Sequence, residues 1–578
     1  MAATIFYDGE CPFCTKYVSL LKLRETVGPV ALVNLREDAE IRAELASEGF
    51  DLDQGMVVDL DGRRVGGAAA TNLLAGMSTP SGAFNRLNRL VFDKPLVSAI
   101  AYPVLRSGRW LTLFLMGRRT INDEEDGRIS RQGLFGLIFA MFSLFHVFNY
   151  IFEYTRVPAQ WDFLAIFVAA LVLLSRPASP RALFFLMLVS TISTIAQAPA
   201  TSNHTMLRSM VLIGYWLSFF YACVRGLPVA SIFANFILAG RGSLLVMYVY
   251  GIFHKINTDF LDPEVSCAIW LWDQMLPPFS WIQHPLMDYT AIYATFIVEG
   301  IVMLALIVPR ARYWGMALGI SFHMFLALSN YSAYISFTTL TISLHVLFLS
   351  AAQIDRINAS SLMGWLKERA QKPTNKLAFL ILLFVGGFAM SEGHYNLASL
   401  SLLPTVIVVC FMIMREGRDP QSERNQTHST AAYVIGTFVT ALYFVNGALP
   451  YAGLKTAQTV NMFSNLRLEG GVSNHLLFTQ TPSAFGYLED VAIFTGQNDD
   501  PVFGRYQQTG FGMVYYELLG RLADHPEARV SFTMNGQTYV DVGGADLQDD
   551  IEKTLHPAFV RKWFHFRPVQ LDRTAACQ

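Results

Sequence analysis

A series of long apolar runs between residues 131 and 449 constrains this chain more than any other feature. Only 15% of its 578 residues are charged and 53% are hydrophobic, whereas soluble proteins carry roughly 25% charged residues. Because a helix needs roughly 20 apolar residues to cross a bilayer, the runs predict about eleven spans. The sequence therefore predicts a polytopic α-helical membrane bundle. The runs begin near Leu134, Trp161, Ala182, Met206, Ile232, Ala291, Tyr313, Ile335, Leu377, Leu397 and Ala432.

Lysine and arginine residues gather in every second loop between the predicted spans. If the N-terminus lies inside, the inner loops carry almost all of them, as the positive-inside rule requires. The first residues do not combine a basic segment with an apolar stretch, so we expect no secretory signal peptide. We expect an integral protein of the bacterial inner membrane type, with a cytoplasmic N-terminus and an extracytoplasmic tail. The inner-loop residues are Arg176, Arg181, Arg225, Arg310, Arg312, Arg356, Lys367, Arg369, Lys372, Lys376, Arg415, Arg418 and Arg424.

Residues 3–76 have the pattern of a small α/β domain. Short apolar runs predict strands at residues 4–8 and 30–35, and on both sides of the Asp61-Gly62 turn. The stretches between and after them predict three helices. The resulting β-α-β-α-β-β-α order is the layout of a thioredoxin-like fold. We therefore expect a thioredoxin-like domain, with an amphipathic linker, over residues 1–120.

Residues 80–119 form that linker and are both basic and amphipathic. Arg106, Arg109, Arg118 and Arg119 lie between or after its apolar stretches. This pattern predicts an interfacial helix that leads into the bilayer. A surface helix of the first domain is the alternative.

The tail, residues 450–578, is too polar to span a membrane. Its runs "HLLFTQ", "VAIFTG" and "RVSFTMNGQTYVDVGG" predict strands, and Asn535-Gly536 predicts a tight hairpin turn. The stretch "GFGMVYYELLGRLADH" predicts a helix. We expect a small α+β domain on the outer face.

Two cysteines, Cys11 and Cys14, follow the first predicted strand and open the first predicted helix. The positive end of a helix dipole favours a thiolate at the first cysteine. Cys11 is therefore the candidate nucleophile, and Cys14, one turn later, the candidate resolving residue. The negative charges of Asp8 and Glu10 oppose formation of the thiolate, because negative charge raises the pKa of a nearby thiol. This interpretation expects two sulfurs that lie close together and are open to solvent.

Two alternatives for this pair stay open. The cysteines are either buried and inert, or half of a zinc site. Zinc needs four ligands, and no further Cys or His occurs before His146. No metal site is therefore predicted.

The stretch "YDGECPFC" resembles the DCC family of thiol–disulfide oxidoreductases, whose motif is Asp-Gly-x-Cys-x-x-Cys. Here the motif residues are Asp8, Gly9, Cys11 and Cys14, and "DLDGRRVGGAAA" fits the second half of that family. The resemblance implies disulfide exchange with a thiol or disulfide protein, or with a small thiol. One departure is the absence of a proline before Met56, where thioredoxins hold a cis-proline facing the dithiol.

Several polar groups lie within the apolar runs or near their predicted outer ends. They are Asn203, His204, Lys255, Glu299 and His323. Ionisable groups at membrane depth are costly and usually face a cavity or a partner. These positions are therefore candidate site residues.

In their order along the chain, these residues resemble the HTTM domain of vitamin K-dependent γ-carboxylases over residues 131–353. The resemblance is carried by Asn203-His204, "YGIFHKINTDF" and "GISFHMF", and the tail segment "MFSNLRLEGGVSNHLL" is also similar to such proteins. It implies that Lys255 deprotonates a reduced quinone of the menaquinone or vitamin K type, with His204 as a hydrogen-bonding partner. No tightly bound cofactor is expected.

Simpler interpretations of these residues stay open. Lys255 is then an interfacial anchor or half of a structural pair, and Glu299 is the partner of a buried cation. His204 and His323 are then satisfied core residues. His146 is expected to hydrogen-bond between helices.

The remaining cysteines are isolated in the sequence, so no disulfide framework is expected. They are Cys223, Cys267, Cys410 and Cys577. A transmembrane dithiol relay needs pairs of cysteines at successive depths of the membrane, and these cysteines are single. We therefore expect either that a quinone carries electrons between the N-terminal domain and the membrane domain, or that the two domains exchange no electrons. No basic block indicates nucleic-acid binding.

We predict a membrane-tethered thiol–disulfide oxidoreductase that is joined to a carboxylase-like membrane domain. A quinone-dependent epoxidase or carboxylase with Lys255 as base is the first alternative. A non-enzymatic membrane scaffold is the second.

Overall fold

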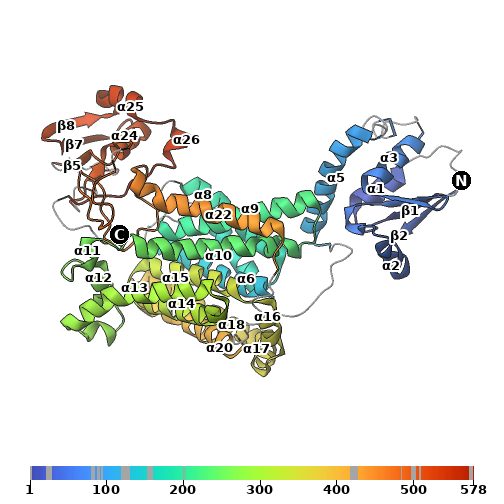
Figure 1. Ribbon diagram of the computed structural model, residues 1–578, viewed down its shortest axis with the longest axis horizontal. Coiled ribbons are helices and arrows are strands. Elements are labelled where there is room, and N and C mark those ends of the chain that lie inside the picture. Colours follow the sequence, from blue (N-terminus) through green and yellow to red (C-terminus); the bar gives the residue numbers. More distant parts are fainter. Residues whose placement is uncertain are drawn as a thin grey trace. The chain divides into compact units, whose positions relative to one another are not determined.

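The computed structural model divides into two compact units (Figure 1). The first holds residues 1–128, 215–236 and 430–432, and the second holds residues 129–214, 237–429 and 433–578. Each unit is described by itself. The described residues are 3–20, 29–79, 85–86, 92, 95–118, 130–152, 161–198, 202–416, 427–482, 484–495, 503–504, 506, 510–571 and 577.

The first unit opens with the predicted β-α-β-α-β-β-α order, around a four-stranded mixed sheet of order β2-β1-β3-β4. Strand β1 pairs in parallel with β2 and antiparallel with β3. Successive side chains of β1 point to opposite faces, so Ile5 and Phe6 enter two separate apolar clusters. The elements are β1 (Ala3–Tyr7), α1 (Pro12–Leu20), β2 (Val30–Asn34), α2 (Ala39–Ser47), β3 (Val57–Leu60), β4 (Arg63–Gly66) and α3 (Gly67–Met77).

Helix α5 (Pro95–Met116) belongs to the same unit. Its Trp110 is buried, stacks on Phe114 and meets the edge of Phe219 from helix α9 (Asn203–Arg225). The Trp110 indole also donates to the carbonyl of Leu227 over 2.6 Å. One face of α5 is thus held by the end of α9 and the turn that follows it.

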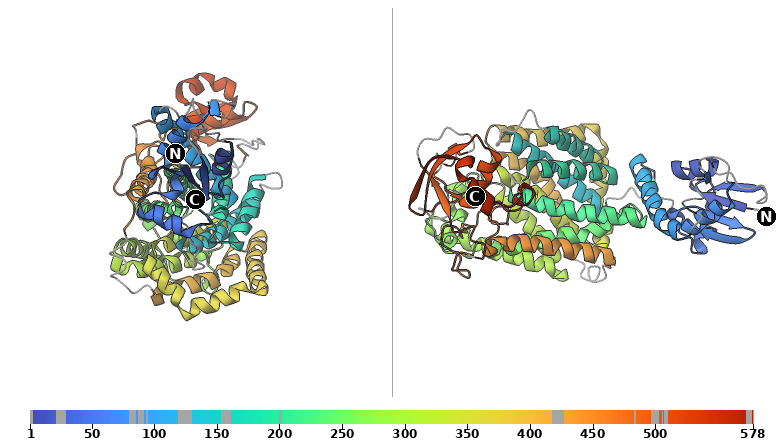
Figure 2. Two further views of the ribbon diagram at one scale, coloured as in Figure 1. Left: turned by 90° about the vertical axis from the view of Figure 1, so that its right-hand side faces the viewer. Right: turned by 90° about the horizontal axis from the view of Figure 1, so that it is seen from above.

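The second unit is built mainly of helices, many of which run side by side (Figure 2). Within the described residues, eight helices are long and apolar enough to cross a membrane, or nine if α15 and α16 count as one broken span. The full-length helices are α6 (Arg131–Phe152), α8 (Pro180–Gln197), α9, α10 (Ala230–Phe253), α13 (Pro285–Ile307), α18 (Pro373–Ser391), α19 with α20 (Tyr395–Ser399 and Leu403–Glu416) and α22 (Thr430–Ala448).

Three of the eleven predicted spans differ from this description. Helices α7 (Trp161–Ser175) and α14 (Arg312–Leu326) have 15 residues each, fewer than the roughly 20 that cross a bilayer. Helix α15 (Ser332–His345) runs through a short 3-10 turn and meets α16 (Ala351–Ala359) at 99°. Apolar length in the sequence does not reveal such breaks.

Burial separates the centre of the bundle from its periphery. The apolar window of α6 is 89% buried, against 22% for α18, so α6 is central and α18 peripheral. Helix α15 packs against α6, and all of its residues except Phe337 are buried. Several of its hydroxyls donate to carbonyls within the same helix, as Thr339 does to Ile335 and Ser343 to Leu340. This bonding lets a Ser/Thr-rich helix occupy an apolar interior.

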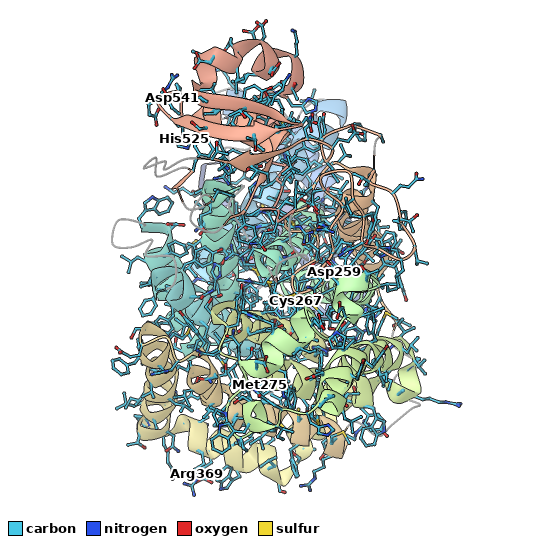
Figure 3. All side chains as sticks on the ribbon, turned by 90° about the vertical axis from the view of Figure 1, so that its left-hand side faces the viewer. Asp259, Cys267, Met275, Arg369, His525 and Asp541 are labelled. Carbon is cyan, nitrogen blue, oxygen red and sulfur yellow. A yellow bond between two sulfur atoms is a disulfide. The ribbon has the colours of Figure 1, made fainter. Side chains whose placement is uncertain are left out.

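The tail folds into a second four-stranded sheet, of order β6-β5-β7-β8, with antiparallel pairing throughout. Figure 3 labels His525 and Asp541 on this domain. Asn535 and Gly536 form the predicted turn, both with positive φ. The segment "HLLFTQ" is not a strand, and only His475 makes an isolated bridge, to Asn257. The elements are β5 (Val491–Phe494), β6 (Met513–Val514), α24 (Tyr515–Asp524), β7 (Arg529–Met534), β8 (Gln537–Gly543), α25 (Gln548–Thr554) and α26 (Ala558–Arg561).

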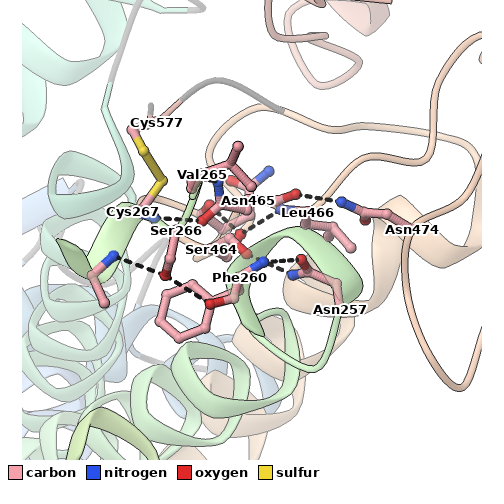
Figure 4. Close-up of a disulfide and its surroundings, with 12 residues drawn as sticks. Asn257, Phe260, Val265, Ser266, Cys267, Ser464, Asn465, Leu466, Asn474 and Cys577 are labelled. Carbon is pink, nitrogen blue, oxygen red and sulfur yellow. Dashed lines mark hydrogen bonds between the residues drawn. A yellow bond between two sulfur atoms is a disulfide. The ribbon is translucent and has the colours of Figure 1, made fainter. Parts of the chain in front are cut away.

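A disulfide joins Cys267 and Cys577, which lie 310 residues apart in the sequence (Figure 4). Cys267 begins the short helix α12 (Cys267–Asp273), and its amide donates to the Asn465 side chain over 2.8 Å. The expectation that the four later cysteines are isolated is therefore wrong for this pair. The fold, not the spacing, brings the two together.

Candidate functional site

The dithiol lies at the N-terminus of α1, as the sequence predicts. Cys11 directly precedes Pro12, the first residue of the helix, a position that proline favours because it has no amide to satisfy. The amide of Cys14 donates to the Cys11 sulfur over 3.2 Å. The sulfur of Cys11 therefore accepts a hydrogen bond from one of the free amides of the helix N-terminus, where a negative charge is stabilised.

The two thiols differ in acidity because they share a proton. A hydrogen bond from the Cys14 thiol is the main cause that lowers the pKa of Cys11 to about 6, although burial opposes it. The same bond, together with burial, raises the pKa of Cys14. The arrangement holds Cys11 as a thiolate at neutral pH and Cys14 as its protonated neighbour.

Asp8 is held between two arginines that the sequence analysis did not select. Its carboxylate accepts from Arg36 over 2.9 and 3.2 Å and from Arg109 over 2.8 Å. Burial raises the pKa of Asp8, but the Arg36 hydrogen bond and the charges of both guanidinium groups bring it below its ordinary value. The expectation that Asp8 works against the thiolate is therefore incomplete, because one carboxylate and two guanidinium groups leave a net positive charge.

Gly9 gives the motif its tight packing. Its amide donates to the Asn34 side chain over 2.9 Å. A Cβ at this position would lie 2.4 Å from the same side chain, nearer than any real contact. A larger residue here would push Asn34 away from the loop that carries Asp8.

Helix α5 covers the dithiol. Leu113 and Tyr7 pack against both sulfur-bearing residues, and Cys11 is 0% and Cys14 7% exposed. The expectation that the sulfurs are open to solvent is thus wrong for this state. The sequence analysis did not identify Leu113, because the spacing of the apolar residues around it predicts an amphipathic helix but not what that helix covers.

The same helix also reaches the turn before Met56, where a proline is absent from the sequence. Tyr102 of α5 lies so near Gly55 that a Cβ there would be 1.9 Å from the phenol oxygen. Gly55 has φ of 146°, which also favours glycine. Among the described residues, the cis peptide bond lies elsewhere, between Pro277 and Pro278. The turn before Met56 is therefore contacted by Tyr102 of α5.

A second candidate site is a cavity of about 340 Å³ within the helices of the second unit. Its wall is mainly apolar and aromatic. Lys255 and Glu299 both line it, both are 8% exposed, and the ammonium donates to the carboxylate over 2.7 Å. The second carboxylate oxygen, Oε2, is buried and has no hydrogen-bond partner among the described residues. The structure thus places Lys255 beside a cavity and in an ion pair.

Three further polar side chains belong to the cavity wall. Asn203 lines it and accepts from the amide of Val460 over 2.8 Å. His323 and Tyr248 also line it, and the Tyr248 hydroxyl lies 3.0 Å from the Nε2 atoms of His323 and His345. Tyr248 and His345 were not selected from the sequence, since a tyrosine in an aromatic-rich helix carries no distinctive signal.

His204 is not a partner of Lys255, contrary to the expectation from the resemblance. Its Nδ1 lies 2.8 Å from the Ser202 hydroxyl, and its ring meets the edge of the His146 ring. Both ring nitrogens of His146 are buried and without a partner among the described residues, so the expected helix–helix hydrogen bond is also not observed. These two histidines pack on each other, and neither lines the cavity.

Comparison with known proteins bears on the first site. Residues 5–113 match the family of DCC1-like thiol-disulfide oxidoreductases, a range that contains the dithiol, Arg109 and Leu113. The match supports a redox function for the N-terminal region. No curated protein and no solved structure matches the chain. The carboxylase-like resemblance of residues 131–353 has no family match to support it.

Proposed function

We propose that this protein is a membrane-tethered thiol–disulfide oxidoreductase that works through Cys11 and Cys14. The observation that carries the proposal is the dithiol at the N-terminus of α1, where the amide of Cys14 donates to the Cys11 sulfur over 3.2 Å. The strand order of the first unit, β2-β1-β3-β4, is also that of thioredoxin-like dithiol proteins.

The proposed reaction exchanges one disulfide for another. The Cys11 thiolate attacks a sulfur of the substrate disulfide, so a mixed disulfide forms and one substrate thiolate leaves. Cys14 then loses its proton and attacks Cys11, which closes the Cys11–Cys14 disulfide and releases the second substrate thiol. The substrate gains two electrons, and a thiol protein or small thiol returns the oxidised pair to the dithiol state.

Because α5 seals the sulfurs, exchange requires this helix to move away from the dithiol. The inert-cysteine alternative does not need this motion. The charges around the cysteine pair argue against the inert-cysteine alternative. Two guanidinium groups and a backbone amide near a sulfur stabilise a thiolate, whereas an inert, protonated thiol carries no charge for them to stabilise.

Replacement of the resolving cysteine tests the proposal. In Cys14→Ser, the Cys11 thiolate still attacks but the mixed disulfide persists, because nothing resolves it. We expect a covalent adduct of the purified full chain with a small aromatic disulfide probe, located at Cys11 by peptide mass spectrometry. Cys223→Ser, which keeps the dithiol, is the matched control and should not retain the probe. Absence of the adduct would refute the proposed role of Cys11.

We also propose the orientation predicted from the loop charges. The Cys267–Cys577 disulfide supports it, because disulfides persist in oxidising compartments and the N-terminal dithiol needs a reducing one. In intact cells, an impermeant phosphine followed by an impermeant maleimide should label Cys577. Ser47→Cys, an exposed position on α2, should be labelled only after lysis. Labelling of Ser47→Cys from outside would reverse the orientation.

The cavity favours a second candidate function, quinone-dependent epoxidase or carboxylase chemistry in the membrane unit. It is apolar, and it places Lys255 and Glu299 at its wall. For Lys255 to act as a base, its proton must pass to Glu299 along the 2.7 Å contact. Mass spectrometry of lipid extracted from the purified protein tests this: a prenylated quinone lost in a cavity-blocking Ala294→Phe variant supports it. An extract free of quinone eliminates it.

A further inference from the structure

The charges beside the dithiol come from parts of the chain that are far apart. Asp8 precedes the cysteines in the β1–α1 loop, whereas Arg109 lies on α5, 101 residues later than Asp8. The Arg109 side chain is 9% exposed, and its guanidinium also donates to the carbonyl of Asp53. A buried guanidinium with such partners has a fixed position, so its field at the sulfurs is fixed as well.

Arg109 lies on the helix that covers the dithiol. Its positive charge acts to lower the pKa of both Cys11 and Cys14. Leu113, which packs on the two cysteines, lies four residues later and therefore on the same face of α5. One helical face thus supplies both the apolar cover and the positive charge. The other titratable or charged groups near this site are Tyr7 from β1, Tyr102 from α5, Asp53 from the turn before β3, Arg36 after β2, Glu10, and Arg118 just after α5, which lies 3.8 Å from Glu10.

We propose that Arg109 supplies the positive charge that holds reduced Cys11 as a thiolate, so that docking of α5 both covers and activates the dithiol. Asp8 then positions the guanidinium, and Arg36 balances the charge of Asp8. Without Arg109, the Asp8–Arg36 pair is neutral, and only the helix terminus and Cys14 would stabilise the thiolate. This inference rests on the proposed dithiol function and names the residue that tunes it.

A purely structural clamp is the competing explanation of the Arg109–Asp8 contact. The two explanations differ in the sign of their effects. If the pair is a clamp, replacing either partner loosens α5 and changes the thiolate in the same direction. If Arg109 acts through its charge, replacing Arg109 and replacing Asp8 move the titration of Cys11 in opposite directions.

The experiment follows the ultraviolet absorbance of the thiolate against pH, in the reduced full chain in detergent. Cys223 and Cys410 are first changed to serine, so that the dithiol alone titrates among the free cysteines. We expect Arg109→Gln to raise the midpoint, and Asp8→Asn to lower it, each by roughly one pH unit, the lower end of the effect of a neighbouring charge. Arg109→Lys, which keeps the charge, should restore most of the wild-type midpoint.

Arg36→Gln is the matched control, because it removes an arginine that contacts Asp8 but does not cover the sulfurs. Its shift should be smaller than that of Arg109→Gln. Shifts of the same sign in Arg109→Gln and Asp8→Asn, or an unmoved midpoint in Arg109→Gln, would overturn the inference. The titration does not require disulfide exchange, so failure of the proposed function is detected separately by the Cys14→Ser adduct.

Discussion

Replacing Cys11 with serine is expected to abolish disulfide reduction by the full chain, with a loss of roughly three orders of magnitude or more. A serine hydroxyl is not ionised at neutral pH and is a far weaker nucleophile than a thiolate. The reduction of insulin in the presence of dithiothreitol, with purified protein in detergent, measures the effect. The wild-type rate should also fall as the pH drops below about 6, where protonation removes the Cys11 thiolate.

The control for this substitution is Cys410→Ser, which changes a free cysteine on α20 and leaves the dithiol intact. Its rate should equal that of the wild type. If Cys11→Ser keeps a substantial part of the activity, the N-terminal dithiol is not the site of exchange. The inert-cysteine alternative would then be preferred.

Replacing Lys255 with methionine is expected to lower the free energy of unfolding by about 3–5 kcal/mol, since it leaves the buried carboxylate of Glu299 without its partner. The two side chains are each 10% exposed and lie 2.7 Å apart. The double variant Lys255→Met/Glu299→Leu removes both charges and should recover most of the loss. Denaturant titration in mixed micelles measures all three proteins.

A matched surface pair serves as the control for Lys255. Lys372 lies 3.9 Å from Glu368 on an exposed helical segment, with side chains 54% and 70% exposed. Lys372→Met should change stability little, because water screens such pairs. Equal effects of Lys255→Met and Lys372→Met would show that the pair at the cavity is not a buried ion pair.

The dithiol and the residues that contact it show how much of a site local sequence pattern can predict. Cys11 and Cys14 were found from the sequence because a two-residue spacing after a strand places both at one helix terminus. Arg109 and Leu113 were not, because nothing within α5 says which of its faces meets the cysteines. Cys11 is buried because the same face of α5 covers it, and the sequence pattern does not predict that contact.

The second unit shows the same contrast between local pattern and long-range packing. Lys255 and Glu299 were selected because ionisable groups in apolar runs are costly alone, and the structure joins them. His204 was assigned to Lys255 from a resemblance, yet it bonds Ser202 instead. The Cys267–Cys577 disulfide was missed, since a separation of 310 residues leaves no trace in spacing.

Elements with local causes could be predicted from the sequence: the strand and helix order of the first domain, most of the long apolar helices, the Asn535-Gly536 turn and the dithiol at a helix terminus. Hydrophobic periodicity, turn residues and the length of apolar runs depend on residues within a few helical turns of one another. These features can therefore be recognised in a single sequence. The charge that faces Cys11, the helix that covers it and the partner of Lys255 depend on long-range packing. Arg109 contacts Asp8 across 101 positions of the sequence and Lys255 contacts Glu299 across 44, and such contacts are selected by packing in three dimensions and not by spacing.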